Sequence, residues 1–244
     1  MKPLLKIILK YYLKYITKLV LIIHRPFIIA VAGSTNKTFV KDEVAKVIRK
    51  KGYFVRANQN NFNTEIGLPL AVLDLPSGYN SYRKWLPTLY QSLFCLFRLN
   101  YPKYLILELG ASNRGDMRHL LSIINPKISI ITDITQRYLE NFSDMNDLTE
   151  EYKILAKKTV ARGQIIINCD NIKLKKIYDS IRGKKQSFGQ TAGCDWRIEN
   201  CGRTEKGEKF QLEHKGNIIE KEIDYFGEHH IYAAVSSLII NEIV

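Results

Sequence analysis

An apolar run that ends in a glycine and a Lys-Thr pair constrains the fold of this chain more than any other segment. Residues 28–32 have the composition of a buried β-strand. The segment that follows reads Gly33, Ser34, Thr35, Asn36, Lys37 and Thr38. A nucleoside triphosphate needs inward-facing backbone N–H groups, a helix N-terminus, an ammonium group and a hydroxyl for Mg²⁺. Gly33, Lys37 and Thr38 would supply three of these needs, so the segment predicts a phosphate-binding loop.

The residue before the lysine departs from the usual pattern of such a loop. Glycine is expected there, because the backbone crowds the phosphate, and this chain has Asn36 instead. Asparagine tolerates a left-handed backbone better than most residues, so we expect the loop to keep its shape. The motif alone is equally compatible with an ordinary strand–turn–helix connection.

The composition indicates a folded and strongly basic protein. Its 244 residues are 45% hydrophobic and 25% charged, enough for one large α/β domain or two small ones. A formal net charge of +13 suits a phosphate-bearing ligand, a nucleic acid or an anionic membrane surface. No RNA- or DNA-binding motif accompanies the charge, so we expect no nucleic-acid partner.

The cysteines give no sign of a metal site. They are Cys95, Cys169, Cys194 and Cys201, and none forms a C-x-x-C pair with another. We therefore expect reduced thiols, as in a cytoplasmic protein, and no zinc.

Residues 1–24 predict a basic amphipathic helix. Among apolar and aromatic residues, lysines recur at every fourth position: Lys2, Lys6, Lys10, Lys14 and Lys18. This spacing lays a slowly winding basic stripe on an apolar rod. Such a helix could lie on anionic lipid at the inner face of a membrane, or pack on its own domain with its lysines in solvent. Because lysines interrupt each apolar run and no cleavage site follows, we expect neither a spanning helix nor a cleavable signal.

Residues 25–244 predict one α/β domain. Helical patterns alternate with short apolar strands at Tyr53–Val55, Tyr104–Leu107, Ile128–Ile131 and Gln164–Ile167. This alternation favours a doubly wound, mostly parallel sheet. Glu108 ends one buried strand, at the position where open α/β sheets bind ligands. After residue 184 short alternating runs, beginning with Ser187–Gly189, predict a small antiparallel sheet, and a helix from about residue 231 closes the chain.

Taken in order, the motifs resemble those of the central ATP-binding domain of the Mur ligases. The likeness is greatest to the type that adds D-alanyl-D-alanine to UDP-N-acetylmuramoyl-tripeptide, and it extends from residue 27 to about 240. The matching segments are Gly33–Thr38 with Lys41-Asp42, Asn61–Pro69, Leu107–Ser112 with Arg114–Asp116, Asn168–Asp170, and Gly227–His230 with Ala233-Ala234.

This resemblance implies roles for particular residues. ATP would phosphorylate a carboxylate of a UDP-muramoyl peptide precursor, and an amine would then attack the acyl phosphate. Lys37 would stabilise the transferred phosphoryl group, while Thr38 and Glu108 would hold Mg²⁺. Gly33, Ser34, Thr35, Asn36, Asn168, Asp170 and His229 would lie around the nucleotide.

Other positions depart from the family pattern. The family's metal-binding histidine aligns with Tyr138, its carbamylated lysine aligns with Tyr152 beside Lys153, and Ala233 replaces an asparagine. The UDP-sugar domain and the acceptor domain are missing from the match. Two interpretations therefore stand: a ligase that works alone or with a partner supplying the acceptor domain, and a nucleotide-binding or scaffold protein that has lost catalysis.

Overall fold

The computed structural model of the chain describes residues 3–58, 62–79, 81–137 and 139–244. One nine-stranded sheet runs through it in the order β2-β3-β1-β4-β5-β6-β7-β8-β9. The strands are β1 (Phe27–Ala32), β2 (Val55–Ala57), β3 (Tyr104–Leu109), β4 (Ile128–Ile131), β5 (Gln164–Asn168), β6 (Lys184–Gly189), β7 (Trp196–Arg203), β8 (Glu208–His214) and β9 (Asn217–Ile223). Neighbours from β2 to β7 pair in parallel, and β7, β8 and β9 pair antiparallel.

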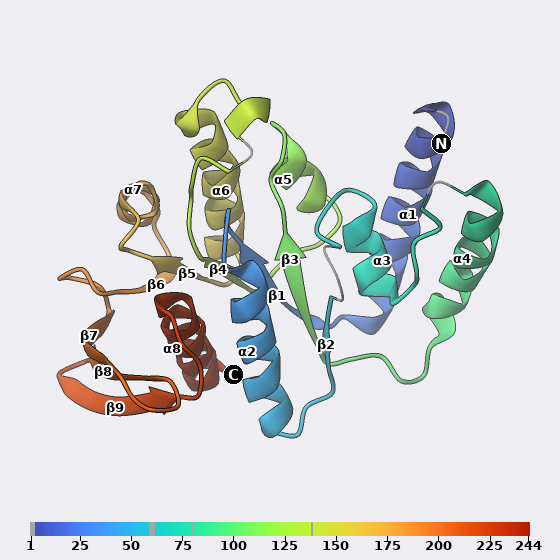
Figure 1. Cartoon of the computed structure of the whole chain (residues 1–244). Helices are drawn as coiled ribbons and strands as arrows, with labels where there is room; N and C mark the ends of the chain where they lie inside the picture. Colours follow the sequence, from blue (N-terminus) through green and yellow to red (C-terminus); the bar gives the residue numbers. More distant parts are fainter. Residues whose placement is uncertain (1–2, 59–61, 80, 138) are drawn as a thin grey trace.

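Helices cover both faces of the parallel part (Figure 1). They are α1 (Pro3–His24), α2 (Lys37–Lys50), α3 (Gly67–Leu73), α4 (Tyr82–Phe94), α5 (Asp116–Leu120), α6 (Met145–Val160), α7 (Ile172–Ser180) and α8 (Glu228–Ile243), with 3₁₀ turns η1 (Cys95–Phe97) and η2 (Leu139–Asn141). Alternate residues of β1 separate the two cores: Ile29 and Val31 pack with α2 and α8, whereas Ala30 and Ala32 pack with α3, α5, α6 and α7.

The predicted doubly wound, mostly parallel sheet is confirmed. The strand predicted at Tyr53–Val55 lies slightly further along, at Val55–Ala57. The antiparallel strands near the C-terminus are also present, and they extend the edge of the parallel sheet rather than standing apart from it. Ser187–Gly189 was wrongly grouped with them: these residues belong to β6, which pairs in parallel with β5. Their pattern is short and carries no sign of strand direction.

Helix α1 packs on the domain through one apolar stripe. Leu9, Leu13, Ile16 and Val20 are buried against α3 and α4. Lys6 and Lys10 pair with Glu65, at 3.3 and 2.6 Å, in the segment that leads into α3. Among the helices that the structure describes, none offers an apolar stretch long enough to cross a membrane.

The expectation of reduced thiols fails for one pair of cysteines. Cys169, just after β5, forms a disulfide with Cys194 in the loop between β6 and β7. The two residues are 25 positions apart, and only the parallel pairing of β5 with β6 brings them together, so no local spacing could indicate the bond. Their sulfurs and the Asp170 carboxylate lie within 4.8 Å of one another, but both sulfurs are used in the disulfide. Cys95 and Cys201 are free.

Candidate functional site

The loop between β1 and α2 has a backbone that few residues can adopt. Gly33 has φ +142°, and a Cβ atom there would lie 2.1 Å from Thr132 Oγ1. Asn36 has φ 62° and ψ 4°, the left-handed conformation that a glycine would adopt at this position. The expectation that asparagine preserves the loop shape is therefore met.

The end of β4 holds this loop in place. Ser34 N donates to Asp133 O at 2.8 Å, and Thr132 Oγ1 donates to Thr35 O at 2.6 Å. Thr135 N donates to Ser34 Oγ at 3.0 Å. The loop that the sequence predicts is thus supported from a strand almost a hundred residues further along the chain.

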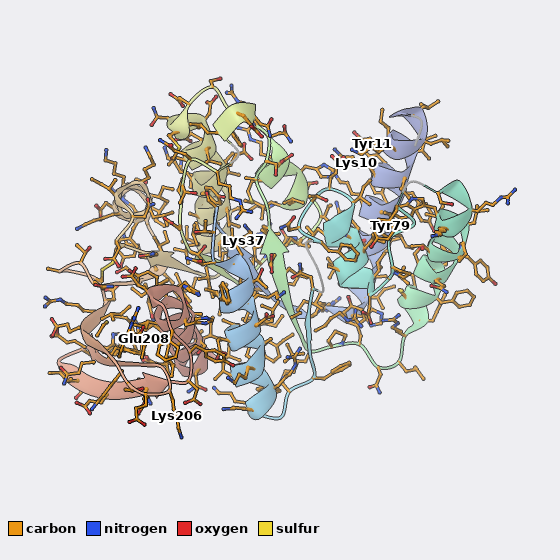
Figure 2. The ribbon with its side chains drawn as sticks, in the orientation of Figure 1. Lys10, Tyr11, Lys37, Tyr79, Lys206 and Glu208 are labelled. Atoms are coloured by element: carbon orange, nitrogen blue, oxygen red, sulfur yellow. A yellow bond between two sulfur atoms is a disulfide. The ribbon has the colours of Figure 1, made fainter. Side chains whose placement is uncertain are left out.

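Lys37 lies at the first turn of α2 (Figure 2), and its ammonium group folds back over the loop. Its Nζ donates to Gly33 O at 2.7 Å. Burial lowers the pKa of Lys37, the charge of Glu108 opposes that effect, and the charge of Arg137 adds to it. A phosphate at the loop would give this ammonium a charged partner in place of a backbone carbonyl.

Glu108 lies beside the loop at the end of β3, in register with Val31 of β1. Its side chain is 2% exposed, and its Oε1 atom lies 3.1 Å from Lys41 Nζ. Lys41 also donates to Asn58 O at 3.0 Å, and Asn58 Oδ1 accepts from Glu108 N at 2.9 Å. Lys41 therefore holds the carboxylate of Glu108, while Asn58 holds both Lys41 and the backbone of Glu108.

The sequence interpretation placed Lys41 with the matching segment of residues 33–38 but gave it no role in the site. Lys37 and Lys41 are one helical turn apart, so both point from α2 toward the carboxyl edge of the sheet. The spacing was visible in the sequence, but which lysine meets Glu108 depends on how α2 crosses β3.

Thr38 and Glu108 offer a hydroxyl and a carboxylate oxygen at this edge of the sheet. Thr38 is exposed in the first turn of α2, and Glu108 is buried with only an ion pair on Oε1. Oxygen ligands of this kind, completed by substrate phosphates and water, are the set that Mg²⁺ takes in nucleotide sites. The residues present therefore fit a magnesium ion.

Asn168 is the last residue of β5 and Asp170 lies two residues later, and other groups of the protein hold both side chains. Asn168 Nδ2 donates to Thr132 O at 3.0 Å, which ties β5 to the strand that supports the loop. Asp170 accepts from Gln190 N, from Thr191 N and Oγ1, and from Tyr232 OH at 2.8 Å. Burial alone would raise the pKa of Asp170, but these hydrogen bonds outweigh it and lower the pKa.

His229 lies in the first turn of α8 and reaches the start of α2. Its ring centroid is 4.7 Å from that of Phe39 and 4.2 Å from that of His230. Phe39 is the second residue after Lys37, so His229 lies on the same side of the domain as the loop. Burial and the neighbouring His229 lower the pKa of His230.

A polar cavity of about 270 Å³ lies beyond β3, where the segment leading into α3 faces the loop after the strand. Gly110, Ser112 and Thr64 line it together with Lys6 of α1. Asp116 Oδ2 accepts from Ser112 N and from Asn113 N, and the buried Glu151 accepts from Gly115 N and Met117 N. These carboxylates give the loop a defined shape.

The structure describes three of the residues at or beside the positions that depart from the family pattern. Tyr152 is a residue of α6 that is buried in the core, and the neighbouring Lys153 pairs with Glu150 at 2.7 Å. Ala233 is fully buried in α8. Tyr138 lies outside the described residues.

These features define a class. The domain has the features of an α/β domain of the phosphate-loop type. These are a parallel strand, a glycine-containing loop, a helix that starts with lysine, and a carboxylate on the neighbouring strand. The family follows from the whole chain: residues 31–240 match the model of the Mur ligase middle domain, and the chain belongs to the Mur ligase family.

Curated relatives and solved structures agree with this assignment. The UDP-N-acetylmuramoyl-tripeptide--D-alanyl-D-alanine ligase of Haemophilus influenzae is 23% identical over 215 residues, which cover 87% of this chain and 42% of that protein. The Bacillus subtilis enzyme of the same name is 23% identical over 211 residues, which cover 86% of this chain and 40% of that protein. The chain thus spans about two fifths of the length of these relatives.

Among solved structures, the MurF ligase of Thermotoga maritima in complex with ADP superposes with a TM-score of 0.78 at 20% identity, covering 96% of this chain and 49% of that one. MurF of Acinetobacter baumannii gives a TM-score of 0.73 at 18% identity, and the match covers 94% of this chain and 45% of that one. The fold is shared with both.

Proposed function

We propose that this chain is the ATP-binding part of an ATP-dependent amide ligase of peptidoglycan precursor synthesis. The observation that carries the proposal is the phosphate loop of residues 33–38 beside the buried carboxylate of Glu108. Membership of the Mur ligase family supports it, as do the names of the relatives. We assign the ATP-binding domain to residues 25–244 and treat residues 1–24 as an accessory helix.

The reaction has two steps. A carboxylate oxygen of the precursor attacks the γ-phosphorus of ATP, the bond to the bridging oxygen breaks, and ADP leaves. The amine of the second substrate then attacks the acyl phosphate, phosphate leaves and an amide forms. Lys37 would release Gly33 O and bind the transferred phosphoryl group, where its charge stabilises the charge that develops.

Backbone N–H groups of Gly33, Ser34, Thr35 and Asn36 would cradle the phosphates at the N-terminus of α2. Thr38 and Glu108 would hold Mg²⁺, which when bound neutralises charge on the β- and γ-phosphates. Asn168, Asp170 and His229 would lie toward the nucleoside, on the β5 and α8 side of the loop.

The substrate that we propose is a UDP-muramoyl peptide. Its reacting carboxylate would enter through the cavity beside Gly110 and Ser112, which opens next to the end of β3. The domain that delivers the amine would lie outside the matched residues 31–240, and we propose a partner protein as its source. The competing interpretation is a nucleotide-binding scaffold without turnover, and the intact Lys37, Thr38 and Glu108 favour the ligase.

We also propose that the chain works in the cytoplasm, with residues 1–24 in contact with an anionic membrane surface. The basic residues Lys14 and Lys18 of α1 are half-buried, so their ammonium groups can reach the surface along apolar stems. This contact would hold the ligase where cell-wall precursors are completed.

Calorimetry of MgATP binding to the purified chain tests the nucleotide site. We expect micromolar binding that is lost in both Lys37→Ala and Glu108→Ala, followed by release of phosphate when precursor and amine donor are added with the partner domain. A folded chain that binds no MgATP would rule out the ligase. Binding without any release of phosphate under these conditions would favour the scaffold.

A further inference from the structure

Helix α1 carries a second apolar stripe that the domain leaves uncovered. Its members recur at helical spacing, and each is at least half exposed: Leu4, Ile8, Tyr11, Tyr15, Leu19 and Ile22. This stripe lies opposite the buried one of Leu9, Leu13, Ile16 and Val20. A helix that is apolar on both sides is unusual in a water-facing position, because a surface helix normally turns a polar face to solvent.

Helix α4 and the turn η1 continue the same kind of surface. Their exposed apolar side chains are Leu86, Tyr90, Leu93, Phe94 and Phe97, with Phe97 79% and Leu86 67% exposed, and the exposed Leu99 follows η1. Tyr90 and Phe94 are one helical turn apart and pack edge to face at 5.0 Å. The sequence interpretation placed only residues 1–24 at a membrane and gave α4 no such part.

The two helices lie side by side and form one surface (Figure 1). Tyr12 OH donates to Leu89 O at 3.1 Å and lies 3.0 Å from Ser92 Oγ. Between them runs an almost wholly apolar groove of about 450 Å³, lined in part by Leu5, Ile8 and Leu86. The exposed residues therefore make a contiguous patch rather than scattered single contacts.

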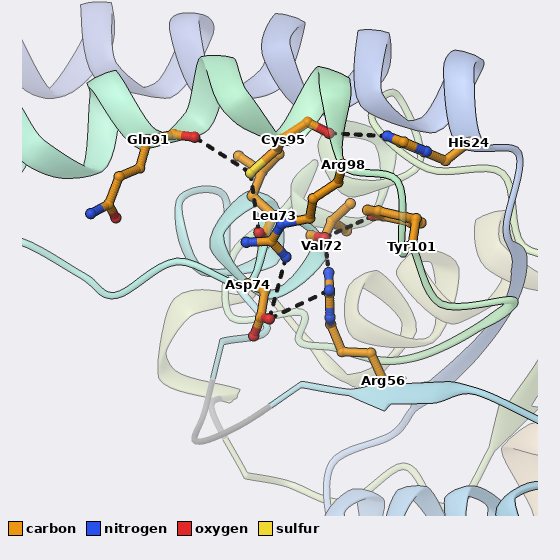
Figure 3. Close-up of polar contacts among 9 residues, drawn as sticks. All are labelled: His24, Arg56, Val72, Leu73, Asp74, Gln91, Cys95, Arg98 and Tyr101. Carbon is orange, nitrogen blue, oxygen red and sulfur yellow. Dashed lines mark hydrogen bonds and ion pairs between the residues drawn. The ribbon is translucent and has the colours of Figure 1, made fainter.

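A polar cluster under the C-terminal ends of α1 and α4 fixes the pair to the domain (Figure 3). His24 Nε2 contacts Cys95 O at 3.0 Å, and the His24 ring stacks on Tyr101 at 4.3 Å. Arg98 and Arg56 both pair with Asp74, each at 3.4 Å. The apolar face is thus attached to the domain at its base.

The positive charge around this exposed apolar face favours an anionic lipid surface as its partner. Residues 1–41 and 75–107 contain no aspartate or glutamate, and the nearby Glu65 and Asp74 pair with Lys6 and Lys10 and with Arg56 and Arg98. The same ranges also contribute Lys14, Lys18, Arg25, Arg83 and Lys84 among other basic residues. A second copy of the chain would bring the same basic surroundings to the interface and be repelled. An anionic lipid surface would be attracted, and its acyl region would accept the apolar and aromatic side chains.

We propose that α1, α4 and η1 together form a membrane-docking face that inserts into the interfacial layer of an anionic bilayer. The proposal rests on the membrane contact proposed for residues 1–24 and extends it to a second helix. Lys6 and Lys10 of α1 remain tied to Glu65 beside the cavity, so docking would place the mouth of the proposed substrate site next to the lipid surface.

Vesicle flotation tests this face. The probes are vesicles of phosphatidylcholine alone and of phosphatidylcholine with phosphatidylglycerol in equal parts. We expect the chain to float with the anionic vesicles and the variant Tyr90→Ser with Phe94→Ser to bind them about tenfold more weakly. The matched control is Ile172→Ser with Ile218→Ser, which removes two side chains of 70% and 65% exposure from α7 and β9 and should bind like the unmodified chain.

Three results would overturn the proposal. One is a folded chain that floats with neither kind of vesicle. Another is an α4 variant that binds as tightly as the control variant, which would leave α1 alone at the membrane. The third is a dimer that Tyr90→Ser with Phe94→Ser dissociates, without any vesicle binding. MgATP calorimetry on Tyr90→Ser with Phe94→Ser keeps the ligase proposal separate, because both residues lie on α4, which packs on α1 and η1, and should not change nucleotide affinity.

Discussion

Lys41 Nζ lies 3.1 Å from Glu108 Oε1, and the two side chains are 6% and 2% exposed. The pair joins the first turns of α2 to the end of β3, so it links the phosphate loop to the carboxylate proposed for Mg²⁺. Without nucleotide, Lys41 balances a charge that would otherwise be buried alone. This makes Lys41 a positioning residue for Glu108.

Replacing Lys41 by methionine should destabilise the chain. The apolar stem is kept, but the Glu108 carboxylate loses its ion pair in a buried place, and Asn58 O loses a donor. Breaking one side of a buried pair costs about 3–5 kcal/mol. Urea denaturation measures the change. Adding Glu108→Gln to Lys41→Met should restore more than half of the lost stability, and a double variant as unstable as the single one would contradict the pairing.

Gly33→Ala should be poorly tolerated. A Cβ atom there would lie 2.1 Å from Thr132 Oγ1 and 3.0 Å from the backbone of Asp133, and φ +142° is unfavourable for any L side chain. We expect a loss of about 1–3 kcal/mol in unfolding free energy and weaker nucleotide binding. Gly202→Ala is the matched control: it meets no atom within 4 Å, so it should stay within about 0.5 kcal/mol of the unmodified chain.

Asn36 should respond differently to alanine and to glycine. At φ 62°, Asn36→Ala should cost about 1 kcal/mol, whereas Asn36→Gly should cost nothing, because glycine adopts this conformation freely. Differential scanning calorimetry and MgATP calorimetry measure both variants. Lys215→Gly, at φ 52° in the β8–β9 turn, should also be tolerated but leave nucleotide affinity unchanged. Equal stability of Asn36→Ala and Asn36→Gly would contradict the strained loop.

The strand–loop–helix segment around residues 33–38 and the central strands could be predicted because their signals are local. Ile28–Ala32 and Ile128–Ile131 are short apolar runs bounded by polar residues, and both form strands. The strand-end position of Glu108 followed from the same pattern. The role of Lys41 could not be predicted in this way, because its contacts with Glu108 and Asn58 join three separate segments of the chain.

Helix α1 shows that the sequence alone does not decide which face of a helix is buried. The regular lysine spacing predicted the helix itself, and both Leu13 and Tyr15 belong to apolar stripes beside the lysines. Only packing on α3 and α4 decides that Leu13 is buried and Tyr15 exposed. A packed helix and a lipid-facing helix are therefore not exclusive alternatives: one face of α1 is packed on the domain, and the exposed face is the one that we propose for lipid.

The charge of Lys37 should make stability depend on pH in a defined direction. Burial holds the pKa of Lys37 below its ordinary value of 10.5, so between the folded and unfolded pKa values the folded chain binds fewer protons than the unfolded chain. Its stability must then rise with pH in that window relative to Lys37→Met, which has no such proton.

Urea denaturation of both proteins from neutral to alkaline pH measures the difference, with Lys50→Met, on the exposed last turn of α2, as the control. A difference that is constant or that shrinks with rising pH would contradict the lowered pKa. Bound MgATP should abolish the effect, because phosphate charge favours the protonated ammonium and raises its pKa again.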